Sequence, residues 1–146
     1  MKIIALDSGT KTGWATNEPE IISGVQDFSL RRGESPGMRF LMFQNWLRRM
    51  AETIKPDMIV YERAHHQGGA ATEVCVGLTA MIQAICAEAK IEHVAIHTAT
   101  LKKHATGKGN AGKEAMMEAA TEKGWLYEDD NEADALWLLD YAIENY

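Results

Sequence analysis

The chain opens with an apolar run that ends on a carboxylate and a turn. Residues 3–6 are Ile-Ile-Ala-Leu, and they are followed directly by Asp7 and by the glycine-containing segment 8–10. An apolar run bounded by such a turn predicts a buried strand, with Asp7 at its carboxyl end. Because an isolated buried charge is costly, Asp7 must be paired, hydrogen-bonded or bound to a cation. The fold therefore has to bring partners to this strand end.

The pattern after Asp7 predicts a mixed sheet covered by helices. Residues 14–16 and 21–30 are predicted to be strands that complete an antiparallel meander. The elements predicted after the meander are a helix at 38–55, a strand at 58–61, a helix at 70–89, a strand at 93–96, a short helix at 98–104 capped by Thr98, a helix at 113–123, and a last helix that begins at Asp129 or Asp130. A meander followed by helix-connected strands gives an α/β fold whose five-stranded sheet has three antiparallel strands and then two parallel ones. With 146 residues and no internal repeat, the chain is predicted to form one domain, residues 1–146.

The composition is that of an ordinary globular protein, with 46% hydrophobic and 25% charged residues. No window contains 18 consecutive apolar residues, and Met1 leads into the first strand instead of a signal peptide, so we expect no membrane contact and a cytoplasmic location. Cys75 and Cys86 lie on one predicted helix, roughly 16 Å apart at 1.5 Å per residue, which is too far for a disulfide. Free thiols agree with a reducing compartment.

The charge distribution is uneven. A net charge of −6 argues against a nucleic-acid partner. However, residues 99–113 contain four lysines and no acid, whereas residues 114–146 contain ten acids and one lysine. This asymmetry is compatible with a basic strip beside an acidic pocket, and equally with two solvated faces of opposite sign.

Three acids are candidates for a shared site. Asp7 and Glu62 each occupy the last position of a short apolar strand, so parallel pairing of these strands would place both carboxylates at one edge of the sheet. Asp134 lies early in the last helix, and Asp130 and Asn131 share its helical face. Clustered carboxylates without cysteine suit a hard cation, Mg²⁺ or Mn²⁺, and two such ions can hydrolyse a phosphodiester. The alternative is that Asp7 and Glu62 cap neighbouring elements and Asp134 is a surface acid.

Four motifs occur in order along most of the chain. They are IIALDSGTKTGWA at residues 3–15, VYE at 60–62, ATLKKHATGKGNAGK at 99–113 and NEADAL at 131–136. Together they resemble the RuvC-type Holliday-junction resolvases. The resemblance implies a ribonuclease H-like homodimer that binds four-way branched DNA and nicks two opposed strands, leaving 5′-phosphate and 3′-hydroxyl ends. It also implies two Mg²⁺ or Mn²⁺ ions per active site, a role in DNA recombination and repair, and the cytoplasm of a bacterial cell or virus-infected host cell.

The resemblance assigns metal-binding and catalytic roles to Asp7, Glu62 and Asp134. The family's fourth acidic or histidine position falls on Asn131, whose carbonyl can bind a hard cation but brings no charge and cannot act as a base. Asp130, one residue earlier on the same face, is the alternative fourth ligand.

The resemblance also indicates which residues contact DNA. The family's aromatic wedge position falls on His65, with His66 beside it; the alternative is two exposed loop histidines. Lys113 opens a helix and is expected to stabilise charge at the scissile phosphate. The residues expected to bind DNA are Arg63, His65, His66, Lys102, Lys103, Lys108 and Lys113.

Competing interpretations remain. The segment 107–114 resembles a phosphate-binding P-loop, but Glu114 replaces the required hydroxyl and no buried strand leads into it, so we expect no nucleotide cofactor. The Asp-Ser-Gly-Thr turn also resembles the phosphate loop of actin-like ATPases, which need two such domains. The remaining alternatives are a nuclease of the same fold that acts on RNA or other branched DNA, and a protein that binds junctions without cutting them.

Overall fold

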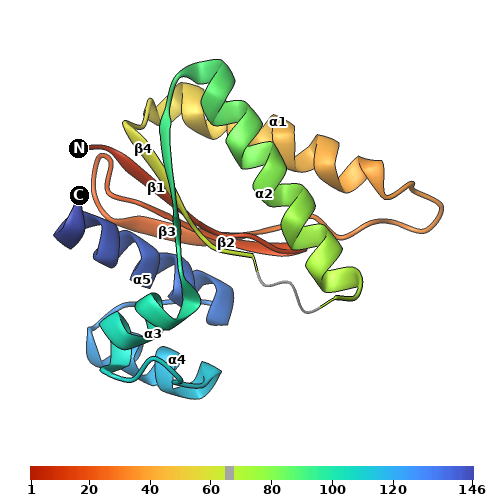
Figure 1. The fold of residues 1–146 in the computed structure, drawn as a ribbon. Helices are drawn as coiled ribbons and strands as arrows, with labels where there is room; N and C mark the ends of the chain where they lie inside the picture. Colours follow the sequence, from red (N-terminus) through yellow and green to blue (C-terminus); the bar gives the residue numbers. More distant parts are fainter. Residues whose placement is uncertain (65–67) are drawn as a thin grey trace.

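The computed structural model describes residues 1–64 and 68–146. Its strands form one five-stranded sheet in the order β3-β2-β1-β4-β5 (Figure 1). The strands are β1 (Ile3–Asp7), β2 (Lys11–Thr16), β3 (Ile22–Asp27), β4 (Met58–Glu62) and β5 (Glu92–Ile96). β1, β2 and β3 pair antiparallel, whereas β4 pairs parallel with both β1 and β5. The predicted mixed sheet is therefore confirmed.

Helices cover both faces of this sheet. They are α1 (Gly37–Ile54), α2 (Ala70–Ala89), α3 (Thr98–Thr106), α4 (Lys113–Glu122) and α5 (Asp130–Asn145). Figure 1 shows α1 and α2 on one face and α5 on the other, with α3 and α4 beyond α5. α5 is buried on nearly all sides because it packs against β1 and β2 as well as against α3 and α4.

Side chains alternate between the two faces of the central strand β1. Ile3 and Ala5 belong to the hydrophobic cluster formed with α3, α4 and α5, whereas Ile4 and Leu6 belong to the cluster formed with α1 and α2. This is the two-residue period of a strand that is buried on both faces. The same period fixes the face on which the next residue, Asp7, emerges.

Three sequence-based boundaries were wrong. β2 begins at Lys11, not at residue 14, because residues 11–16 pair continuously with β3. β3 ends at Asp27, whose carboxylate instead closes a local turn by accepting from the Ser29 amide. α3 extends to Thr106 and is preceded by His97, without a side-chain cap, so Thr98 does not cap it.

The start of α5 is defined by its cap. The Asp129 carboxylate accepts from the Glu132 amide at 2.9 Å, and the Glu132 carboxylate accepts from the Glu128 amide. Such a cap satisfies helix amides that would otherwise lack partners. Of the two predicted capping residues, Asp129 is therefore the one used, and Asp130 is the first residue of the helix.

The helix α2 is long and apolar enough to cross a membrane by length and composition alone, with a hydropathy of 1.6 over its best window. The sequence-based exclusion of any such segment was therefore too strong. Leu78, Ile82 and Ile85 are nevertheless buried in the cluster with α1 and the sheet. The core helix of a globular protein passes the same test. On its outer side Val76 is 41% exposed.

Candidate metal-binding active site

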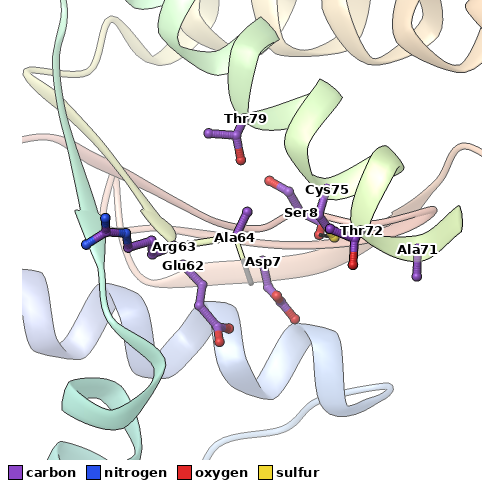
Figure 2. A pocket seen from close by; sticks show the side chains of 9 residues that line it. All are labelled: Asp7, Ser8, Glu62, Arg63, Ala64, Ala71, Thr72, Cys75 and Thr79. Carbon is purple, nitrogen blue, oxygen red and sulfur yellow. Dashed lines mark hydrogen bonds between the residues drawn. The ribbon is translucent and has the colours of Figure 1, made fainter. Parts of the chain in front are cut away.

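The two strand-end acids emerge on the same face of the sheet. Asp7 follows Ile3 and Ala5 in the alternation of β1, and Glu62 follows Met58 and Val60 in that of β4; all four apolar residues belong to the cluster with α5. Because Leu6 is the register partner of Tyr61, Asp7 and Glu62 leave neighbouring strands at the same level. In Figure 2 both carboxylates point toward α5.

The third acid reaches this point because α5 crosses very close to β2. Gly13, the register partner of Asp7, lies against the backbone of Asn131. A Cβ atom at Gly13 would lie 1.9 Å from the Asn131 carbonyl oxygen, so only glycine permits this approach. The close contact places the first turn of α5, and with it Asp134, beside the ends of β1 and β4.

Asp7, Glu62 and Asp134 form a compact cluster of carboxylates. Each offers one carboxylate oxygen, and these oxygens lie within 4.8 Å of one another. Such spacing lets a single cation contact all three side chains, and an all-oxygen donor set is the one that Mg²⁺ and Mn²⁺ prefer. The residues present therefore fit a hard divalent cation.

The pKa values of the clustered acids indicate that a nearby positive charge would stabilise their ionised forms. Burial raises the pKa of Asp7 well above its usual range, and the nearby carboxylates of Asp134 and Glu62 raise it further. Burial and then the charges of Glu62 and Asp130 raise the pKa of Asp134 to about 7. Like charges in a desolvated site disfavour ionisation, and a bound cation would reverse that effect.

These pKa values predict how the metal-free protein responds to pH. Between pH 4 and 7 the folded chain keeps a proton on Asp134 that the unfolded chain releases near the ordinary pKa of 3.8. The folded state then binds more protons, so the free energy of unfolding falls as pH rises through this window. Three pH units at 1.36 kcal/mol each set an upper limit of about 4 kcal/mol.

The measurement is the difference in Tm between pH 5 and pH 8 in EDTA. We expect wild type to lose more stability than Asp134→Asn across this range. An equal loss in both proteins would contradict the raised pKa of Asp134. Added Mn²⁺ should recover the stability of wild type at pH 8, because cation binding favours the ionised, folded form.

A pocket of about 220 Å³ opens between the acids and the basic helices. Glu62, Asp130 and Asp134 line it together with Lys102 of α3 and Lys113 of α4. The Lys113 ammonium lies 3.2 Å from an Asp130 carboxylate oxygen, and its side chain is 67% exposed. Lys102 and Lys113 both lower the pKa of Asp134, although less than burial raises it. The pocket thus combines carboxylate and ammonium groups.

A second pocket of about 210 Å³ lies on the other side of Asp7 and Glu62 (Figure 2). It is closed by the first half of α2, from which Thr72, Cys75 and Thr79 line it. The Cys75 thiol donates to the Ser8 carbonyl at 3.2 Å and so ties α2 to the turn after Asp7. Cys75 and Cys86 are free thiols, as predicted.

The remaining predicted site residues lie in several places. The Asn131 amide donates to the Asp129 carboxylate at 3.2 Å. Arg63 donates to His97 at 2.8 Å, and its side chain in Figure 2 points away from Asp7. Lys103 and Lys108 are exposed. The predicted junction-contacting residues His65 and His66 lie outside the described residues.

Sequence reasoning missed the role of Thr98. The Thr98 hydroxyl donates to a carboxylate oxygen of Glu62, and Thr98 lines the same pocket as Lys102 and Lys113. The one signal in the sequence was the position of Thr98, two residues after the strand predicted at 93–96. That strand lies next to the strand that ends on Glu62.

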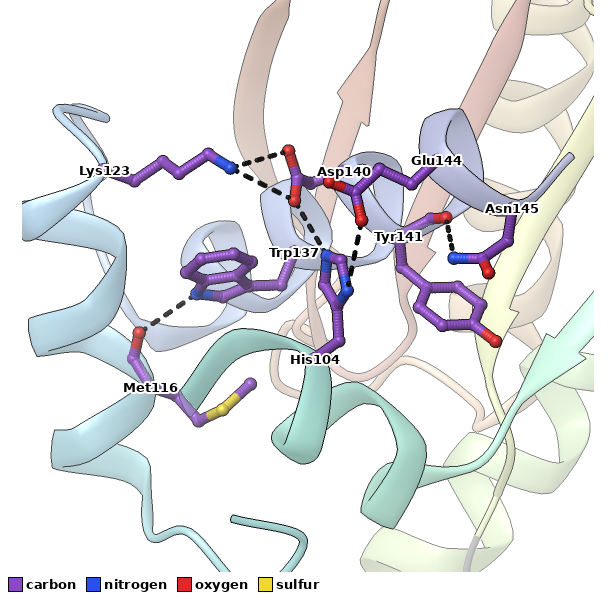
Figure 3. A network of polar contacts seen from close by, with 8 residues as sticks. All are labelled: His104, Met116, Lys123, Trp137, Asp140, Tyr141, Glu144 and Asn145. Carbon is purple, nitrogen blue, oxygen red and sulfur yellow. Dashed lines mark hydrogen bonds and ion pairs between the residues drawn. The ribbon is translucent and has the colours of Figure 1, made fainter. Parts of the chain in front are cut away.

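A second group of potential ligand atoms, from His104, Asp140 and Glu144, joins the helices on the α5 side (Figure 3). One ring nitrogen of His104 lies 2.8 Å from Asp140 and the other 3.6 Å from Glu144, while Lys123 lies 3.3 Å from Asp140. These carboxylates thus already face cationic or hydrogen-bonding partners. We interpret the group as a polar link that holds α3 and the end of α4 against α5.

Comparison with known proteins finds similarity in structure only. No protein-family model matches the chain, and no curated protein sequence matches it. Thermus thermophilus RuvC, solved with a Holliday-junction substrate, has a TM-score of 0.77 at 16% identity, covering 99% of this chain and 94% of that chain. Fowlpox virus resolvase, solved with Holliday-junction DNA, has a TM-score of 0.67 at 14% identity, covering 99% and 97%. The yeast mitochondrial Holliday-junction resolvase Ydc2 has a TM-score of 0.60 at 17% identity, covering 94% and 76%. The ribonuclease H-like fold predicted from the motifs is thereby confirmed.

Proposed function

We propose that this protein is a Holliday-junction resolvase, an endonuclease that nicks two opposed strands of four-way DNA junctions during recombination and repair. The observation that carries the proposal is the convergence of Asp7, Glu62 and Asp134 from β1, β4 and α5. The chain has this acid cluster on a fold that it shares, over nearly its whole length, with resolvases solved on junction DNA. The four sequence motifs support the same function.

In this proposal the three carboxylates hold divalent ions, Mg²⁺ or Mn²⁺, two per active site. When bound, such ions supply a nucleophilic water at neutral pH and stabilise the leaving oxygen of the phosphodiester. The chain itself holds its carboxylates on two strand ends and a buried helix, which keeps the donor atoms fixed. Lys113 and Lys102 hold the phosphate at the mouth of the same pocket and offset its charge.

We further propose Asp130, and not Asn131, as the fourth acidic position. Asp130 lines the pocket with Glu62 and Asp134, whereas the Asn131 amide is bound to the capping residue Asp129. The Lys113 ammonium lies 3.2 Å from the Asp130 carboxylate. A phosphate that takes over Lys113 would leave the Asp130 carboxylate available to the ions.

Contacts with the arms of the junction are assigned to Lys102 and Lys113, which line the pocket, and to Arg63, Lys103 and Lys108, which do not line it. Such contacts to phosphate add affinity and salt sensitivity without sequence information, which suits a substrate recognised by its shape. His65 and His66 are proposed to contact bases at the crossover. We also propose that the protein is located in the cytoplasm, in the same compartment as its DNA substrate.

Symmetric nicking needs two active sites, and we propose a homodimer formed through the outer side of α2. This side exposes Val76 together with Ala80, Ala84 and Ala87, so two helices can approach closely. Dimerisation through this face would remove its apolar surface from water. The apolar character of α2 therefore needs no membrane to explain it. Sedimentation at micromolar concentration should give twice the mass of one chain, and Ala84→Arg should give the monomer.

The function is tested with a labelled four-way junction, a linear duplex of the same sequence and an RNA hairpin, each with and without Mg²⁺. We expect paired nicks in opposed strands of the junction only, with ligatable ends, and only with the cation. Equal cutting of the linear duplex or the hairpin would favour a less selective nuclease. Tight junction binding without cutting would favour the non-cleaving alternative.

A further inference from the structure

The Glu62 side chain is the most demanding of the three carboxylates to position. Glutamate has one more rotatable bond than aspartate, so fixing its carboxylate costs more conformational entropy. Glu62 is also the last residue of β4, so strand pairing fixes its backbone but not the end of its side chain. A site that uses Glu62 therefore benefits from a group that holds its carboxylate in one orientation.

The chain supplies such a group at the junction of β5 and α3. Ile96, the last residue of β5, is the register partner of Glu62, and the Arg63 amide donates to the Ile96 carbonyl at 2.8 Å. Two residues later Thr98 opens α3, and its hydroxyl donates to a Glu62 carboxylate oxygen. The Thr98 hydroxyl is therefore positioned by β5, the strand next to β4, and by α3, a helix of nine residues.

Thr98 is well suited to this task. Its branched Cβ restricts the first side-chain torsion, so the hydroxyl has few alternative positions. α3 itself is held in place by the burial of Leu101 and by the His104 contacts with α5. A carboxylate has two oxygens with several lone pairs, so a hydrogen bond to one oxygen leaves the group able to bind a cation, and metal-ligating carboxylates are commonly held by such hydrogen bonds.

We infer that Thr98 is a positioning residue that orients the Glu62 carboxylate for binding a divalent cation. This inference rests on the proposed function for the use of the cation, but it concerns cation binding itself. It predicts that removal of one hydroxyl group weakens the metal site without changing the ligands.

The test is calorimetric titration of the DNA-free protein with Mn²⁺ at pH 8. We expect Thr98→Val, which keeps the shape and loses the donor, to bind Mn²⁺ about 10-fold more weakly than wild type. Thr98→Ser keeps the donor and should bind within about 3-fold of wild type. Thr100→Val, at an exposed threonine of the same helix, is the matched control and should bind as wild type does. Thr98→Ala serves as the second variant without a donor should Thr98→Val not fold.

A purely structural role for Thr98 predicts a different result. In that case the Tm of Thr98→Val falls while the Kd of the folded protein for Mn²⁺ is unchanged, and the inference is overturned. In junction cleavage, the inference predicts that the Mn²⁺ concentration for half-maximal rate rises in Thr98→Val and that saturating Mn²⁺ restores most of the rate. The two conclusions can also be separated. If wild type binds Mn²⁺ more tightly than Thr98→Val does but does not cut the junction, the proposed function is refuted and the inference about Thr98 stands.

Discussion

Asp7→Asn should abolish cleavage and at the same time stabilise the metal-free protein. The amide keeps the shape of the carboxylate but removes a charge from the point where three carboxylates meet, so ion binding fails and the cleavage rate falls on the order of 10³-fold or more. Burial and the neighbouring acids hold the pKa of Asp7 well above its usual range, which means that its ionised form costs stability at pH 8. Removal of that cost should raise the free energy of unfolding by about 1–2 kcal/mol, or the Tm by roughly 3–8 °C.

Three measurements on the same preparation separate these effects. They are the single-turnover cleavage rate with Mn²⁺, the Kd for the junction with EDTA, and the Tm with EDTA. The Kd should not rise, because Asp7 contributes charge repulsion and not attraction toward phosphate. Glu20→Gln removes an exposed acid and should leave all three unchanged. Retained cleavage in Asp7→Asn would refute the metal-site assignment, and a lower Tm would refute the account of its burial.

Gly13→Ala should damage both the fold and the site. The added methyl group would lie 1.9 Å from the Asn131 carbonyl oxygen and 2.2 Å from its carbon. These are backbone atoms of a helix packed on both sides, so no side-chain rotation can relieve the overlap. The first turn of α5 must move away from β2, which we expect to cost about 2–4 kcal/mol of stability. Because Asp134 moves with this turn, cleavage should fall about 10²-fold even in the fraction that folds.

Gly9→Ala is the matched control, in the turn that follows Asp7. A Cβ atom at Gly9 would lie no closer than 3.6 Å to its nearest neighbour, the Lys11 carbonyl oxygen. We expect its Tm to stay close to that of wild type. Chemical denaturation at 25 °C gives the stabilities, and Mn²⁺ titration reports whether Asp134 is still in place. A Gly13→Ala protein as stable as Gly9→Ala would show that α5 does not need the close approach.

The clustering of Asp7, Glu62 and Asp134 could be predicted from the sequence, because most of its signals are local. Asp7 and Glu62 each end an apolar run of strand length, and their shared position follows from the parallel pairing of two such strands. The i, i+4 spacing of Asp130 and Asp134 follows from helical geometry alone. The strand ends and the helical spacing need only the chain within a few residues of the acid concerned, whereas the parallel pairing followed from the predicted order of the elements.

The features that the sequence did not predict depend on contacts between distant segments. The hydroxyl of Thr98 was expected to cap its own helix, as threonine often does near a helix start, and instead it bonds to Glu62 across the β4–β5 pair. Gly13 directly precedes the strand predicted at 14–16, and no role was predicted for it. A glycine that is required because a distant helix passes over it leaves no local pattern in the sequence. The choice between Asp130 and Asn131 likewise depended on where Lys113 and Asp129 lie.

The position of α5 along the chain also determines when the acid cluster can form. Asp7 and Glu62 belong to strands that are synthesised early, whereas Asp134 belongs to the last helix described. Domains acquire structure as the ribosome delivers their segments, and a chain that has not yet delivered α5 contains two of the three acids and an uncovered sheet face. Such a nascent chain cannot bring the three carboxylates together. Docking of α5 therefore covers the sheet and assembles the acid cluster in one step.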